Sequence, residues 1–146
     1  MTYYIEENII NSVKKLLSGQ VNELLENTEL YVPPLEFTNY RGASAIVPEI
    51  ALSACEQSEK ERIIQQDAYS LTITLSIPET PESERQCYAY AGAVTRAFHE
   101  DPSLGGVVDR TVITGKKYNS PKKPNFGQDW EVVFTLRLTV ERFYVD

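Results

Sequence analysis

The chain has 146 residues, of which 42% are hydrophobic and 24% are charged, a composition typical of a globular protein with one core. Its formal net charge of -7 disfavours wrapping of a nucleic-acid backbone, because such binding requires cations that replace condensed counterions. No apolar run approaches the roughly 20 residues of a membrane-spanning helix, and no basic segment followed by an apolar one opens the chain. We therefore expect a single domain, residues 1–146, made in a cytoplasm, without a membrane partner or a sequence-specific nucleic-acid partner.

The first predicted element is an amphipathic helix over about residues 4–27. Its apolar residues recur at steps of three and four and are Ile5, Ile9, Val13, Leu16, Leu17, Val21, Leu24 and Leu25. This spacing places them on one side of a helix, and the mixed charges on the other side favour packing on a core over binding to a membrane. Ser18-Gly19 could divide the helix, because glycine costs up to about 1 kcal/mol in a helix interior.

Three strands are predicted next, over about residues 35–40, 46–55 and 63–77. The third is the clearest, because apolar residues from Tyr69 to Ile77 alternate with serine and threonine. Residues 46–55 also alternate, but the segment 46–62 has helical propensity as well, so strand and helix both stay open there. Pro48 would mark an edge strand or a bulge. The charged residues 56–61 are predicted to connect the second strand to the third.

A second helix is predicted over about residues 81–100. Thr80-Pro81-Glu82 supplies a hydroxyl cap, a proline in the first turn and an acidic residue at the positive end of the helix dipole. Small residues, mainly alanine, would let this helix approach a sheet closely. Asp101-Pro102 ends it, and Gly105-Gly106 is predicted to form a turn.

The last predicted unit is a long hairpin with strands over about residues 107–118 and 128–144, joined by a loop from Gly115 to Gln128. From Trp130 to Tyr144 apolar and polar residues alternate strictly, as expected for a strand with one face on a core. Fifteen residues would span about 50 Å, so this strand is expected to bend or project. The predicted fold is α+β: an antiparallel, possibly mixed, sheet of about four to five strands, with two main helices packed on one face and a long C-terminal β-hairpin.

Residues with catalytic or metal-binding chemistry are few and scattered. The single histidine, His99, falls near a helix end, where it is typically a surface residue stabilised by the dipole. Cys55 and Cys87 lie too far apart in sequence for a metal motif, and we expect both thiols to be free and buried. We therefore predict no enzymatic activity, no cofactor and no metal site.

One local concentration of a single charge sign occurs in the hairpin loop. Its residues, with two aromatic neighbours, are Lys116, Lys117, Tyr118, Lys122, Lys123 and Phe126. They are the candidate protein-interface residues, since they could contact an acidic partner or phosphates. The alternative is a solvated loop whose lysines deter aggregation.

Three segments resemble bacteriophage tail terminators, also called tail-completion or minor tail protein U-like proteins. They are the helix end Val94–Phe98 running into Asp101–Val108, the hairpin that follows, and the final strand Trp130–Glu141; with Tyr69–Ile77 they cover about half of the chain. The most distinctive part is the junction Asp101-Pro102-Ser103-Leu104-Gly105-Gly106. Residues 46–62 and the long loop 115–128 depart from the shortest members of that family.

The resemblance implies a small α/β protein that forms a ring, commonly a hexamer, on the end of the finished tail tube. The ring would stop tube growth and offer a surface to the head-tail connector. The implied partners are other copies of the chain, the tail tube protein and the connector protein, and the implied location is the virion tail after assembly in the bacterial host cytoplasm. Replacement of the four lysines with glutamate is expected to impair tail joining and to leave the fold intact.

Three alternatives remain open at this point. Another head-tail connector or neck protein would need a similar sheet, loop and ring. A small-molecule-binding or enzyme domain would use an open face of the sheet, and a deep polar pocket with a buried carboxylate or His99 would support it. An interaction module of a cellular system is the third.

Overall fold

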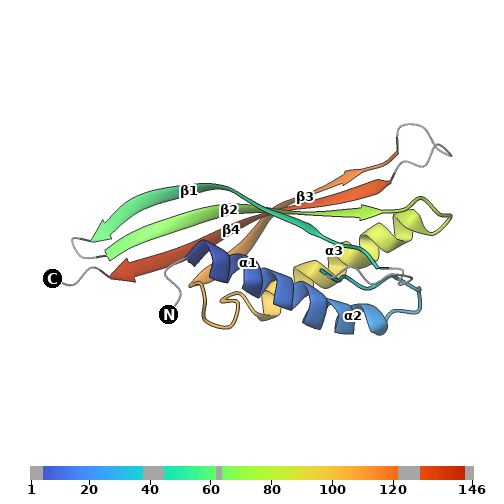
Figure 1. Cartoon of the computed structure of the whole chain (residues 1–146), viewed down its shortest axis with the longest axis horizontal. Helices are drawn as coiled ribbons and strands as arrows, with labels where there is room; N and C mark the ends of the chain where they lie inside the picture. Colours follow the sequence, from blue (N-terminus) through green and yellow to red (C-terminus); the bar gives the residue numbers. More distant parts are fainter. Residues whose placement is uncertain (1–4, 38–44, 62–63, 122–128, 144–146) are drawn as a thin grey trace.

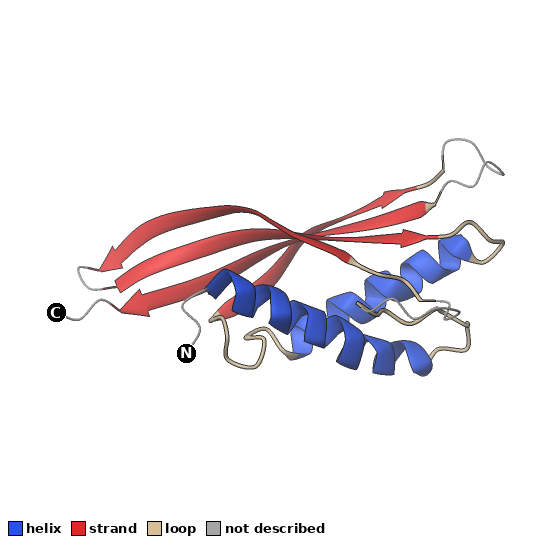
Figure 2. Cartoon of the chain, viewed as in Figure 1, coloured by secondary structure: helices blue, strands red, loops and turns tan. Residues whose placement is uncertain are grey.

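The computed structural model describes residues 5–37, 45–61, 64–121 and 129–143. Its elements, in chain order, are α1 (Ile5–Leu16), the π-helical turn η1 (Leu17–Val21), α2 (Asn22–Glu26), β1 (Glu49–Glu61), β2 (Ile64–Ile77), α3 (Ser83–Glu100), β3 (Arg110–Asn119) and β4 (Trp130–Phe143) (Figure 1). The four strands form one antiparallel sheet in the order β1-β2-β4-β3. The helices lie on one side of this sheet (Figure 2). The predicted α+β class, the antiparallel sheet and the C-terminal strands are confirmed.

The N-terminal helix changes geometry where the sequence has Ser18-Gly19. Its buried residues Ile9, Val13, Leu17, Val21 and Leu25 follow each other at steps of four. In an α-helix each such step overshoots a full turn by about 40°, so the stripe would drift around the helix. The wider turn of the π-helix takes up the drift and keeps Leu17 and Val21 turned to the core. Ser18-Gly19 thus lies in a π-helical turn between α1 and α2, and the chain remains helical through this turn.

The predicted strand over residues 35–40 is not formed in its described part. Leu35 makes only an isolated parallel bridge to Ile46, and residues 38–40 lie outside the described residues. The backbone of Leu35 is bound by a side chain instead: its N–H donates to Asn22 Oδ1 (2.8 Å), and Asn22 Nδ2 donates to its carbonyl (2.9 Å). A side-chain amide on α2 therefore takes the place of a partner strand.

The bounds of β1 differ most from the prediction. The strand begins at Glu49 and continues to Glu61, so the predicted connection 56–61 is part of it and the helical alternative is wrong. Residues Glu56 to Glu59 pair with β2 from Ala68 to Gln65. They are polar because they are exposed at the edge of the sheet, and an exposed edge requires no apolar alternation.

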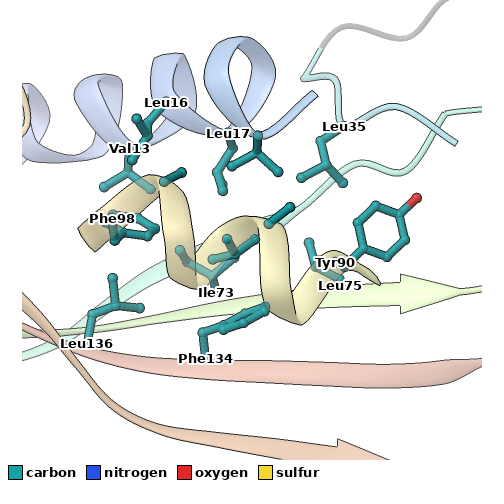
Figure 3. Packing of buried hydrophobic residues seen from close by; sticks show 14 of the residues in the cluster. Val13, Leu16, Leu17, Leu35, Ile73, Leu75, Tyr90, Phe98, Phe134 and Leu136 are labelled. Carbon is teal, nitrogen blue, oxygen red and sulfur yellow. The ribbon is translucent and has the colours of Figure 1, made fainter. Parts of the chain in front are cut away.

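The core lies between the sheet and the N-terminal helix, with α3 in the middle (Figure 3). The helix-facing residues of β2 and β4 are paired and buried: Tyr69 with Leu138, Leu71 with Leu136, Ile73 with Phe134, and Leu75 with Val132. Tyr90 and Phe98 of α3 are almost fully buried above them. The Tyr90 hydroxyl donates to the Pro33 carbonyl, which satisfies its polar end inside the core.

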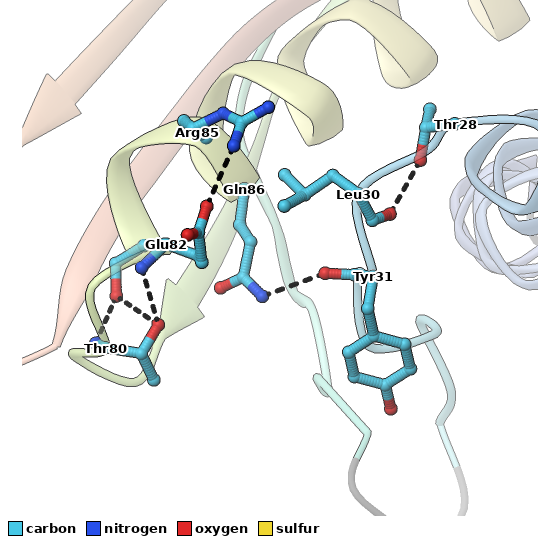
Figure 4. A network of polar contacts seen from close by, with 8 residues as sticks. Thr28, Leu30, Tyr31, Thr80, Glu82, Arg85 and Gln86 are labelled. Carbon is cyan, nitrogen blue, oxygen red and sulfur yellow. Dashed lines mark hydrogen bonds and ion pairs between the residues drawn. The ribbon is translucent and has the colours of Figure 1, made fainter.

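Polar contacts fix the start of α3 (Figure 4). The helix begins at Ser83, two residues after the predicted start, because Pro81 and Glu82 form a turn. Thr80 Oγ1 accepts a hydrogen bond from the Glu82 N–H (3.2 Å), and Gln86 Nε2 donates to the Tyr31 carbonyl (3.1 Å). The last bond ties α3 to the segment that follows α2.

The junction from α3 to β3 reverses the chain through three successive left-handed residues, Leu104, Gly105 and Gly106 (φ 52°, 68° and 94°). The Asp101 carboxylate accepts the Gly105 N–H (3.1 Å), and the Ser103 carbonyl accepts the Val108 N–H (3.0 Å). Leu104 is 4% exposed, so its burial in the core offsets a left-handed conformation that costs about 1–2 kcal/mol in a non-glycine residue. The predicted turn is confirmed, and β3 starts at Arg110, three residues later than predicted.

Candidate functional site

Half of the predicted interface residues lie in a strand. Lys116, Lys117 and Tyr118 belong to β3, which extends to Asn119, so the predicted start of the loop at Gly115 is wrong. Lys122, Lys123 and Phe126 lie outside the described residues. The two described lysines take their directions from the sheet, since side chains alternate between its faces.

A β-bulge at Thr114 decides which face each lysine occupies. Pairing with β4 shifts by one residue between Ile113 and Gly115, and the shift reverses the alternation that follows. Lys116 pairs with the core residue Phe134 and faces α3, where its Nζ lies 3.5 Å from Thr95 Oγ1. Lys117 pairs with Val133 and faces the opposite side. The two described lysines therefore lie on opposite faces of the sheet.

Tyr118 faces α3 as Lys116 does, and it contacts an exposed tyrosine of that helix. The Tyr118 and Tyr88 rings meet edge to face at 5.7 Å between centroids, a favourable arrangement for aromatic pairs. The Tyr88 hydroxyl donates to Glu84 Oε1 (2.8 Å). This hydrogen bond to Glu84, helped by desolvation, raises the pKa of Tyr88. The contact holds α3 beside β3.

The other face of the sheet is open. No helix of the described residues lies on it (Figure 2). Its middle consists mainly of hydroxyl residues, because β2 turns Ser70, Thr72, Thr74 and Ser76 to this side. The sequence predicted this polar face from the alternation in β2.

Among the described residues no further strand pairs with the outer edge of β1 or of β3, and the two edges differ in charge. In the sheet order β1 and β3 each have a single neighbouring strand. Among side chains whose exposure is described, β1 presents the exposed carboxylates Glu49, Glu56 and Glu59 and no cation. On β3 the exposed cations are Arg110, Lys116 and Lys117, and this strand has no acidic residue. Of these residues the sequence indicates only the lysines, because no pattern in it shows which strands lie at the edges of the sheet.

A hollow of about 410 Å³ lies between the end of α3 and the start of β3. His99, Arg110 and Thr111 are among its lining residues. The Thr111 hydroxyl is buried and has no hydrogen-bond partner among the described residues. The buried carboxylate of Asp67 does not line this hollow, and it accepts a hydrogen bond from Gln65 Nε2 (3.0 Å).

The two cysteines have opposite environments, and neither forms a disulfide. Cys87 is buried in α3, as expected, and burial raises the pKa of its thiol to about 11. Cys55 is exposed on β1, so the prediction that it is buried is wrong. The cause is the same as for the charged residues beside it, which occupy the edge of the sheet.

Within residues 5–37, 45–61, 64–121 and 129–143, no group of three or more His, Cys, Asp or Glu residues is placed to hold a metal ion. No helix in these ranges is long and apolar enough to span a membrane. The chain matches no protein-family profile and no curated protein sequence.

Proposed function

We propose that this chain is a non-catalytic structural subunit, a phage or prophage tail terminator. It forms a ring on the end of the tail tube, stops polymerisation of the tube and offers a surface to the head-tail connector protein. The resemblance in the Asp101–Val108 junction and in the strand Trp130–Glu141 supports this function. The proposal includes a hexameric ring, location in the virion tail, and contact with the tube protein.

The observation that carries the proposal is the shape of the sheet. At one end the β1–β2 hairpin and the end of β4 extend beyond the first turn of α1 (Figure 1). No described helix covers one face and no described strand covers either edge, while the other face holds the core (Figure 2). Such a subunit has several separate surfaces for neighbours, which is what a component between a tube and a connector requires.

A ring can end a filament by matching its symmetry. Contacts that are heterologous, with different patches on the two partners, close into a ring when the rotation between copies is right. Each contact with the tube can then be weak, because linked contacts act at high effective concentration. Termination needs repetition and shape, and no bond has to be made or broken.

The experiment is removal of the gene from the phage or prophage that encodes the chain, followed by electron microscopy of the particles. A terminator predicts tubes of irregular and excessive length with no heads attached, and a plasmid copy of the gene should restore normal particles. A head-tail connector or neck protein predicts tails of normal length without heads. Normal tails in the absence of the chain would thus overturn the terminator function.

A further inference from the structure

We propose that the ring is built by one contact, in which the edge of β1 on one copy pairs with the edge of β3 on the next copy. The pairing is antiparallel and continues the sheet from copy to copy. This inference deepens the proposed function and rests on it for the ring, whereas the contact itself is argued from the edges.

The charges of the two edges select a head-to-tail contact. A two-fold contact of β1 with β1 would place Glu49, Glu56 and Glu59 against the same carboxylates, and a contact of β3 with β3 would place cations against cations. Like charges opposite each other in a sheet are destabilising. The contact of β1 with β3 instead places an edge whose described exposed charges are carboxylates beside an edge whose exposed charges are cations. The favoured contact is therefore heterologous, the type that generates rings.

The directions of the strands allow this contact without any reversal. All neighbouring strands in the order β1-β2-β4-β3 are antiparallel, so β1 and β3 run in opposite directions. A second copy placed beside the first in the same orientation brings its β1 antiparallel to β3. Each further copy added in the same way keeps all neighbouring strands antiparallel.

The register follows from rows of paired residues that cross the whole sheet. Two rows on the open face start with glutamate on β1 and end with a cation on β3. The first consists of Glu49, Thr74, Val133 and Lys117, and the second of Glu56, Ala68, Thr139 and Arg110. If the next copy continues these rows without a shift, Lys117 meets Glu49 and Arg110 meets Glu56. Both charge pairs form on one face at the same time.

Small and apolar residues lie between the two charged rows. Continuation of the rows places Gly115 beside Ala51, and Val112 beside Ala54. Val112 is an exposed apolar residue (38%). Contact with Ala54 of the next copy would cover it. The contact thus has an apolar centre and a charge pair at each end.

The bulges of the two edges lie at neighbouring levels of the sheet. The register of β1 shifts between Leu52 and Ala54, and that of β3 between Ile113 and Gly115. Leu52 and Ile113 belong to the same row, through Leu71 and Leu136. Because a bulge bends its strand and increases the twist, both edges bend at this level. Edges that bend together fit each other better than either fits a straight strand.

The test uses two double variants of the full chain. Glu49→Lys with Glu56→Lys makes both edges basic, and Arg110→Glu with Lys117→Glu makes both edges acidic. Each variant alone should sediment as a monomer at concentrations where the unmodified chain associates. An equimolar mixture should associate again, because each basic β1 then meets an acidic β3 and each native β1 meets a native β3.

A matched control carries the same charge change elsewhere. Glu23→Lys with Glu26→Lys alters two exposed carboxylates on α2, and this variant should associate as the unmodified chain does. Higher salt should weaken association of the unmodified chain, since the Debye length falls from about 10 Å at 0.1 M to about 3 Å at 1 M. Circular dichroism melting of every variant shows whether it is folded. If the variant with Glu49→Lys and Glu56→Lys unfolds, Glu49→Gln with Glu56→Gln is the milder replacement.

Three results would overturn the inference. The first is an unmodified chain that stays monomeric up to roughly 1 mM. The second is a folded edge variant that associates as the unmodified chain does. The third is an equimolar mixture of the two double variants that fails to associate. These results concern the purified chain alone. Tail length in the gene deletion separately tests the terminator function, so each proposal can fail while the other stands.

Discussion

The two middle strands and the two edge strands of the sheet are built from different kinds of residues. Strands β2 and β4 pair without interruption from Ile64–Phe143 to Ile77–Trp130, and their helix-facing residues are largely apolar and buried. The pairing of β1 shifts at two places and that of β3 at one, and both strands present exposed charges. The core fixes the middle pair, while the edges are open to a neighbour.

The difference shows how an open-edged sheet can avoid indiscriminate pairing. Charges and bulges are common devices against edge-to-edge aggregation. Here the charges have opposite signs on the two edges, and the bulges lie at neighbouring levels. The same devices that reject a random strand would thus accept one particular edge, that of the next copy.

The middle strands should show the largest effect on stability. Phe134→Ala removes a fully buried ring from β4, and such a substitution costs about 3–5 kcal/mol in the free energy of unfolding. Thr135→Ala, one residue further and exposed on the open face, should change it by less than about 0.5 kcal/mol. Urea unfolding of both variants measures the difference. Similar losses for the two would mean that β4 does not divide core from solvent as described.

The edges should show a smaller effect, on association and not on stability. Lys117→Glu places a carboxylate where the continued row presents Glu49, so self-association should weaken about tenfold, or about 1.4 kcal/mol. Lys116→Glu changes the same charge on the neighbouring residue, but its side chain faces α3 and approaches Thr95. We expect a smaller loss of association for this variant. Sedimentation equilibrium compares them, and equal losses would show that net charge, not register, controls the contact.

Much of the fold could be predicted from the sequence where burial imposes a period. The alternation in β2 and β4, and the proline, acidic residues and alanines at and after the start of α3, predict these elements to within a few residues. The sequence predicts a connection for the charged half of β1, because an edge strand exposed to solvent has the composition of a loop. The sequence predicts a strand at Leu35, because no pattern shows that the Asn22 amide binds its backbone N–H and carbonyl.

The candidate site was predictable only in part. Lysines close together in sequence indicated a charged surface, but Lys116 and Lys117 lie in a strand and therefore alternate between its faces, and the bulge at Thr114 decides which of the two faces α3. A one-residue bulge leaves no clear mark in the sequence of an exposed strand. The charged rows cannot be predicted from the sequence, because the position of Glu49 relative to Lys117 depends on three successive strand pairings.

The two cysteines should differ in their rate of reaction with a thiol reagent, because Cys55 lies on an edge strand and Cys87 lies in the core. Exposed Cys55 at the β1 edge should react with 5,5′-dithiobis(2-nitrobenzoic acid) at pH 8 at least about tenfold faster than Cys87, whose buried thiol stays protonated. Cys55→Ser should remove the fast phase. If the edge of β1 is covered by β3 of another copy, the fast phase should also slow as protein concentration rises, and a rate independent of concentration would argue against that contact.

Cys87 also predicts a pH dependence of stability. Its pKa is raised from 9.0 to about 11 on folding, so above pH 9 the unfolded chain loses a proton that the folded chain retains. The contribution of this thiol to the free energy of unfolding is therefore complete below pH 9 and declines as pH rises towards 11. Burial raises the pKa of Tyr90 as well, which adds a loss of the same sign at higher pH. Urea unfolding between pH 8 and 11 measures the decline. In Cys87→Ala it should be shallower, whereas Cys55→Ser, which alters only the edge strand, should leave it unchanged.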